Sequence, residues 1–237
     1  MSKLRLDVVL TQKGLVATRS QAESYIKLGQ VKINGQIATK PGQMVSDTDK
    51  IELTAKEQYV SRAALKLASV AAKLQLDFKD KVVLDVGSST GGFTEFALKH
   101  GAAKVIAVEL GSNQLHPSLR ANKQVELHEK TDIRQFKTDQ KIDLVLADVS
   151  FISLRQILPS VAKLAGPPAL IVAMVKPQFE AEQDAVKHKG VIKNDKLRRQ
   201  ILKNFEQWAR QQFVVLDKAD SEIAGSKGNL ERFYLLK

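Results

Sequence analysis

The stretch Lys81-Val-Val-Leu-Asp-Val-Gly-Ser-Ser-Thr-Gly-Gly-Phe-Thr94 decides the fold. The apolar run that ends at Val86 is typical of a buried strand, and the glycines that follow predict a sharp turn. A helix is expected to begin at Gly91 or Gly92. Because glycine lets the backbone approach a ligand and the first amides of a helix carry free N–H groups, the stretch predicts a ligand site where the strand ends.

The spacing of the glycines narrows the class of ligand. It reads G-x-x-x-G-G from Gly87, which is neither the G-x-G-x-x-G dinucleotide pattern nor a phosphate-binding P-loop. No lysine follows to hold a phosphate, so a nucleoside ligand fits better than a nucleoside triphosphate. Glu109 ends the next predicted strand, where an acid can accept hydrogen bonds from ribose hydroxyls, and Asp132 after the third strand is placed to reach an adenine edge. We expect S-adenosylmethionine, bound by Asp85, Gly87, Ser88, Gly91, Gly92, Phe93, Glu109, Asp132 and Asp148.

Apolar runs alternate with helical patterns on both sides of this stretch. A helix is predicted over residues 61–75, and strands are predicted at 82–86, 104–108, 125–127, 144–147, 170–175, 214–216 and 232–236. Buried strands joined by helices are typical of a parallel sheet with right-handed crossovers. We therefore expect an α/β, Rossmann-like methyltransferase fold with a mostly parallel seven-stranded sheet whose last strand is antiparallel.

The first 54 residues show a different pattern. Helical spacing over 4–13 and 19–28 is followed by short strands near 31–33, 36–38 and 51–53, with turns at Asn34-Gly35 and Lys40-Pro41-Gly42. This pattern predicts a small α+β domain. We expect it to span residues 1–54, with a junction over 55–60 and a catalytic domain over 61–237.

The composition excludes several classes of protein. Lys and Arg outnumber Asp and Glu by 37 to 26, and the net charge of +11 favours a polyanionic partner, because binding phosphates releases their counterions. With no cysteine, disulfides and thiol catalysis are excluded, and the four histidines lack metal-ligand spacing. The N-terminus lacks the apolar core of a signal peptide, and the longest apolar run is far shorter than the ~20 residues of a membrane span. We expect a cytoplasmic protein with no metal site and no membrane contact.

Four charged residues are expected to meet at the carboxyl end of the sheet. Asp148 and Lys176 each follow a predicted strand there, Glu231 begins the antiparallel last strand at the same edge, and Lys66 reaches over from the preceding helix. A ribose 2′-hydroxyl becomes a good nucleophile when a base shares its proton, and we assign Lys176 as that base or activator. Lys66 and Asp148 would orient the hydroxyl and the ammonium, and Glu231 would hold the lysines. Base amino-methylation is a minor alternative, because Asp148-Val-Ser-Phe151 stands where an Asn/Asp-Pro-Pro-Tyr/Phe motif would be expected.

The chain as a whole resembles the TlyA family, whose members are often named haemolysin A. The blocks Arg5-Leu-Asp, Thr18-Arg19-Ser-Gln-Ala22 and Gly29-Gln-Val-Lys-Ile-Asn34-Gly35 resemble the RNA-binding module first described in small-subunit ribosomal protein number four. The blocks that resemble the FtsJ-like ribose methyltransferases include Ser61-Arg62-Ala63-Ala64-Leu65-Lys66-Leu67, Ala147-Asp148-Val-Ser-Phe, Val175-Lys176-Pro177-Gln178-Phe179-Glu180 and Gly228-Asn229-Leu-Glu231. The resemblance implies 2′-O-methylation of cytidine in ribosomal RNA, with Lys66, Asp148, Lys176 and Glu231 as a Lys-Asp-Lys-Glu tetrad.

RNA contact is expected from the small domain and its junction. The predicted contact residues are Arg5, Arg19, Lys27, Lys32, Asn34 and Arg62. Basic residues on helices with few aromatics favour structured, backbone-rich RNA, here ribosomal RNA within ribosomal subunits, and no obligate protein partner is evident. Two alternatives stay open: a non-catalytic RNA-binding or ribosome-assembly factor, and a membrane-active haemolysin.

Overall fold

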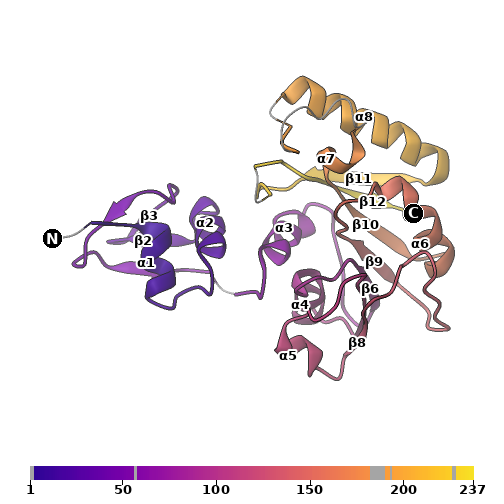
Figure 1. Cartoon of the computed structure of the whole chain (residues 1–237), viewed down its shortest axis with the longest axis horizontal. Helices are drawn as coiled ribbons and strands as arrows, with labels where there is room; N and C mark the ends of the chain where they lie inside the picture. The colour runs from indigo at the N-terminus through magenta and orange to yellow at the C-terminus, as the bar shows by residue number, and fades with distance from the viewer. Residues whose placement is uncertain (1–2, 56–57, 182–189, 193, 226–227) are drawn as a thin grey trace.

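The computed structural model describes residues 3–55, 58–181, 190–192, 194–225 and 228–237 (Figure 1). The small N-terminal domain contains β1 (Leu4–Arg5), α1 (Leu6–Gln12), α2 (Arg19–Lys27), β2 (Val31–Ile33), β3 (Gln36–Ile37), β4 (Met44–Val45) and β5 (Ile51–Leu53). A capping box between Thr18 and Gln21 starts α2, as the sequence indicates. The helix predicted from residue 4 begins two residues later, because β1 pairs with β4 as a separate short ladder.

The rest of the chain forms one large sheet with helices on both faces (Figure 1). Its elements are α3 (Arg62–Ala71), β6 (Val82–Val86), α4 (Gly92–Lys99), β7 (Lys104–Val108), α5 (Pro117–Arg120), β8 (Val125–His128), β9 (Leu144–Ala147), η1 (Leu154–Gln156), α6 (Leu158–Ala165), β10 (Leu170–Val175), α7 (Pro177–Glu180), α8 (Asp195–Gln212), β11 (Val215–Asp220) and β12 (Arg232–Leu236). The strand order is β11-β12-β10-β9-β6-β7-β8, and β12 runs antiparallel to both of its neighbours. The predicted α/β fold is confirmed.

Alternation along the strands divides the core into two layers. Val83 and Val105 pack on one face of the sheet, whereas Leu84 and Ile106 pack on the other, because successive side chains of a strand point to opposite faces. The strand expected at 214–216 extends to Asp220 as β11. The apolar run in the sequence is shorter than this strand because β11 also contains polar residues, and an edge strand can expose such residues to solvent.

The junction between the domains is packed. The Gln21 amide donates to the Tyr59 carbonyl at 2.8 Å, and Tyr59 itself is buried. The Arg62 guanidinium donates to Ser20 Oγ in α2 and to the Ala224 carbonyl after β11, each at 2.6 Å. One hydrophobic cluster runs from the small domain through α3 into the sheet. Within the part of the chain that the structure describes, no helix is long and apolar enough to cross a membrane.

Candidate active site

The glycine turn after β6 is shaped by close packing. Gly87 and Gly91 have φ of +82° and +93°, a backbone region that residues other than glycine rarely adopt. A Cβ on Gly87 would lie 2.8 Å from the Asp148 carbonyl oxygen, and one on Gly91 or Gly92 would collide with Leu119 or Ser61. The glycines predicted for close ligand approach are therefore also required by the packing of the turn itself.

Asp85 lies beneath this turn and is fully buried. Burial raises the pKa of its carboxyl to about 7, against the hydrogen bond that Thr94 Oγ1 donates to it at 2.6 Å. Its second oxygen and the Ser88 hydroxyl are buried and have no hydrogen-bond partner in the part of the chain that the structure describes. Both residues line a small cavity of about 130 Å³ that also contains Asp148 and Lys176. Polar atoms that lack a partner in such a place are ready to receive one from a ligand.

A larger cavity of about 820 Å³ lies beside the glycine turn. Gly87, Glu109, Asp132, Asp148 and Phe151 are among the residues that line it. The Glu109 carboxylate accepts hydrogen bonds from the Ser89 and Gly111 amides at 2.9 and 2.7 Å, so it links the turn to the loop after β7. The cavity thus brings together the turn and both acids predicted for a nucleoside ligand.

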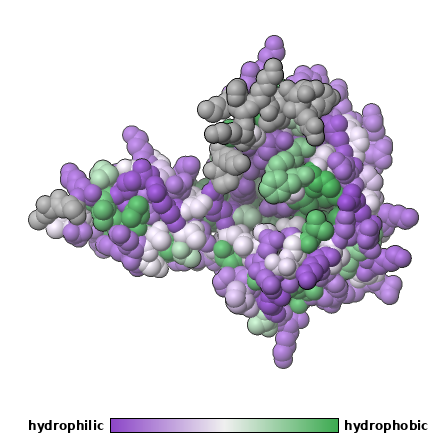
Figure 2. All heavy atoms as spheres, viewed as in Figure 1, coloured by the Kyte–Doolittle hydropathy of each residue, from purple (hydrophilic) through white to green (hydrophobic). Residues whose placement is uncertain are grey.

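Asp132 lines the large cavity, and its carboxylate is hydrogen-bonded to Arg134. Arg134 donates to both carboxylate oxygens, at 2.5 to 3.1 Å, and these bonds hold the pKa of Asp132 below its usual value. A hydrogen bond from a ligand to Asp132 would therefore share its acceptor with a guanidinium. Figure 2 shows a hollow with apolar surface on one face of the larger domain, surrounded by hydrophilic residues.

The four predicted catalytic residues form two lysine–carboxylate pairs. Lys66 Nζ donates to Glu231 Oε1 at 2.9 Å, and both side chains are nearly buried, at 11% and 3% exposed. Lys176 Nζ lies 2.6 Å from Asp148 Oδ1, as an ion pair whose angles do not make a hydrogen bond, and donates to Ser150 Oγ at 2.7 Å. We expected Glu231 to hold both lysines; instead each lysine has its own carboxylate, and Glu231 Oε2 is buried with no hydrogen-bond partner among the described residues.

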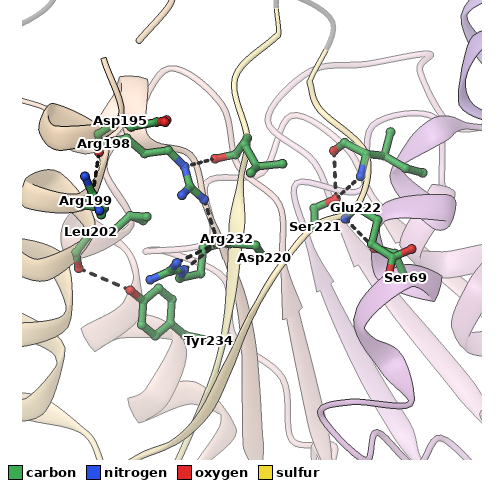
Figure 3. Close-up of polar contacts among 12 residues, drawn as sticks. Ser69, Asp195, Arg198, Arg199, Leu202, Asp220, Ser221, Glu222, Arg232 and Tyr234 are labelled. Carbon is green, nitrogen blue, oxygen red and sulfur yellow. Dashed lines mark hydrogen bonds and ion pairs between the residues drawn. The ribbon is translucent and has the colours of Figure 1, made fainter. Parts of the chain in front are cut away.

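The residues on either side of Glu231 are held by a network that includes Arg198, Asp220 and Arg232 (Figure 3). Arg198 of α8 donates to the Leu230 carbonyl at 3.0 Å and to Asp220 at 2.7 Å, and Arg232 donates to both oxygens of Asp220. Burial raises the pKa of Asp220, but the bonds from Arg232 and Arg198 outweigh it and keep that pKa low. The residues on either side of Glu231 are thereby anchored to α8 and β11.

The helix that carries Lys66 is tied to the same hairpin. Ser69 Oγ donates to the Lys66 carbonyl at 2.7 Å and accepts from the Glu222 amide at 3.3 Å (Figure 3). Gly225 lies against the Glu231 carboxylate, since a Cβ there would lie 2.5 Å from Glu231 Oε1. Ser69 and Glu222 are 153 positions apart, so no local pattern indicates their contact.

Phe151 was quoted in the sequence only as part of the Asp-Val-Ser-Phe block, with no role. Its side chain is 92% exposed, its φ is +66°, and its ring centroid lies 5.3 Å from that of Phe179. This strained, exposed aromatic lines the large cavity next to Ser150 and leaves most of its surface open to solvent. The exposure follows from the loop geometry, which the sequence does not reveal.

The predicted RNA-contact residues differ in their exposure and in their contacts within the chain. Arg5 and Arg19 converge on the fully buried Asp7, at 2.7 and 3.0 Å, with their side chains 45% and 53% exposed. Lys27 is exposed and Lys32 is half-buried. Asn34 and Arg62 are occupied by contacts within the chain, Asn34 bridging to Asp49 and Lys50 and Arg62 joining the two domains. Among the residues described, no three His, Cys, Asp or Glu side chains gather as a metal site.

Known proteins resemble the chain along nearly its whole length. A family model described as FtsJ-like methyltransferase matches residues 59–237, and one described as S4 domain matches residues 4–51. Hemolysin A of Brachyspira hyodysenteriae is 37% identical over 96% of this chain and 97% of that protein. The 16S/23S rRNA (cytidine-2'-O)-methyltransferase TlyA of Mycobacterium tuberculosis is 36% identical over 99% of this chain and 90% of that protein. A solved structure from Streptococcus thermophilus, described as a hemolysin, superposes with a TM-score of 0.73 at 36% identity, over 100% of this chain and 88% of that one.

Proposed function

The chain belongs to the FtsJ-like methyltransferase family, and from this premise we propose that it transfers a methyl group from S-adenosylmethionine to a ribose 2′-hydroxyl of ribosomal RNA. The observation that carries the proposal is the pair of lysine–carboxylate contacts beside the glycine turn. The TlyA relative that acts on cytidine in both ribosomal RNAs supports cytidine as the target nucleoside.

The residues around the large cavity fit S-adenosylmethionine. Glu109 and Asp132 provide carboxylates for hydroxyl and amino donors, and Gly87 keeps the backbone close to the cavity wall. The unpartnered oxygens of Asp85 and Ser88 are acceptors in the wall of the adjoining small cavity. When bound, S-adenosylmethionine supplies a methyl group on a sulfonium that a ribose oxygen can attack.

Each lysine–carboxylate pair has a different task at the ribose hydroxyl. Lys176 Nζ is held by Asp148 and Ser150. In its neutral form, after the ammonium has released a proton to solvent, it takes up the 2′-hydroxyl proton, which it then returns to solvent. Lys66, held by Glu231, orients the hydroxyl oxygen. Fixing these nitrogens before the substrate arrives lowers the entropy that the reaction must lose, which is a large part of what positioning contributes to catalysis.

RNA is held by the basic small domain and by the rim of the site. Arg5 and Arg19 present guanidinium groups for phosphate contacts, which fix position without reading sequence. Phe151 supplies a ring on which an unstacked base can lie, as single-stranded bases do on exposed aromatics. A substrate of this kind places the protein in the cytoplasm.

The test is transfer of labelled methyl to purified ribosomal subunits and to naked ribosomal RNA. Wild type is compared with Lys176→Ala and with Lys203→Ala, a matched loss of an exposed lysine on α8. We expect wild type and Lys203→Ala to label a ribose 2′-oxygen, mapped by resistance of the linkage to alkali, and Lys176→Ala to label nothing. RNA binding without any labelling by wild type would reject the proposal in favour of a non-catalytic assembly factor. Labelling of a base nitrogen would reject ribose as the acceptor.

A further inference from the structure

Glu180 is a buried acid that the proposed chemistry does not use. It lies at the end of α7, four residues after Lys176, and its side chain is 1% exposed. Its Oε2 accepts a hydrogen bond from Ser153 Oγ at 2.6 Å, and its Oε1 accepts one from the Leu154 amide at 2.7 Å. Arg155 Nε lies 3.5 Å from the same carboxylate. A buried carboxylate is costly unless it is bonded in this way, and burial raises the pKa of Glu180 above its usual value despite these bonds.

The segment that Glu180 holds forms a wall of both cavities. Residues 148–154, here called the β9 loop, include Asp148 and Ser150, which line both cavities, and Phe151, which lines the large one. Among the residues that the structure describes, five contacts fasten this loop to the Lys176–Glu180 segment. They are Lys176 to Asp148 and to Ser150, Phe179 to Phe151, and Glu180 to Ser153 and to Leu154.

The β9 loop is in a conformation that needs such support. Phe151 has φ of +66°, a region that is strained for a bulky residue and persists only where the surroundings enforce it. Its ring is 92% exposed, so burial of Phe151 does not hold the loop in place. The bonds to Glu180 hold the loop two and three residues after Phe151, and the contacts of Lys176 with Asp148 and Ser150 hold it on the preceding side.

We infer that Glu180 is a positioning residue, whose carboxylate locks the β9 loop onto α7 so that Asp148, Ser150 and Phe151 keep one geometry relative to Lys176. The inference rests on the proposed function for its catalytic consequence, but the locking itself is a property of the chain. Glu180 contacts neither cavity, and it acts through the loop.

The test compares Glu180→Ala with Glu180→Gln. The alanine removes both hydrogen bonds, whereas the glutamine amide can accept from the Leu154 amide and donate to Ser153 Oγ, because a hydroxyl serves as donor or acceptor. Leu236→Ala is the control for lost stability, since Leu236 is fully buried and pairs with Ile171 at the opposite end of β10 from the site. Hydrogen exchange at Leu154, the dissociation constant for S-adenosylmethionine, and single-turnover methyl transfer are measured well below the melting temperature.

We expect Glu180→Ala to lose exchange protection at Leu154, to weaken cofactor binding, and to slow methyl transfer by about 10- to 100-fold, the effect of a misplacement near 1 Å. Glu180→Gln should stay within about threefold of wild type, and Leu236→Ala should keep its protection and its rate. Wild-type behaviour of Glu180→Ala in exchange and cofactor binding would overturn the inference, and so would equal damage from the glutamine. If wild type transfers no methyl, the proposed function fails, while the exchange measurement still decides the role of Glu180.

Discussion

Gly225→Ala tests whether the position of the Glu231 carboxylate matters for catalysis. A Cβ at position 225 would lie 2.5 Å from Glu231 Oε1 and 3.4 Å from the Asn229 carbonyl oxygen. Ordinary contact begins near 3.4 Å, so the carboxylate must move by 3.4 − 2.5, or about 0.9 Å. Because Oε1 also accepts the bond from Lys66 at 2.9 Å, this movement disturbs the lysine as well.

The expected effects on stability and on rate both depend on which atom moves. The displaced atom ends a flexible side chain, so the free energy of unfolding should fall by only about 1–2 kcal/mol. A displacement near 1 Å in a catalytic group can cost about 100-fold in rate. Neither Gly225 nor Glu231 lines the large cavity, and cofactor affinity should therefore stay at the wild-type value.

The assay is single-turnover methyl transfer to ribosomal RNA, together with calorimetric titration of S-adenosylmethionine. Gly228→Ala is the matched control in the same loop, since its φ of +94° adds strain but a Cβ there meets no atom within 4 Å. A rate for Gly225→Ala within threefold of wild type would refute the reasoning. An equal loss in Gly228→Ala would assign the effect to the loop backbone and not to Glu231.

Three further outcomes are expected. Burial raises the pKa of Asp85 to about 7 from its ordinary 3.8, so the stability that this group contributes is present below about pH 4 and is lost as pH rises to 7. In urea titrations, the unfolding free energy of Asp85→Asn relative to that of wild type should therefore rise by about 3 kcal/mol between pH 5 and 8. A difference that stays constant with pH would contradict this. Phe151→Ala should weaken RNA binding by about 1–3 kcal/mol while Phe151→Tyr preserves it, and equal loss in both would exclude stacking. Arg19→Ala should reduce the slope of log K against log salt for RNA binding by about one, whereas an unchanged slope would remove Arg19 from the phosphate contacts.

The sequence by itself determined the layered α/β architecture, the glycine turn and the charged residues at strand ends, Asp148, Lys176 and Glu231. These features are readable because each depends on neighbours within a few positions. Apolar runs mark buried strands such as Val82–Val86, and a polar residue directly after such a run must lie at the edge of the sheet. Residues Asp148 and Lys176 were found in this way.

Only the tertiary structure decided how those residues combine. Strand order places β12 between β10 and β11, and this order pairs Lys66 with Glu231, 165 positions away, and leaves Lys176 to Asp148. The positive φ of Phe151 and the burial of Glu180 come from the packing of α7 on the β9 loop. Arg62, expected to bind RNA, joins the domains because α2 and the loop after β11 both reach it. Such contacts link distant segments, and their partners are set by the topology of the whole chain and not by any local pattern.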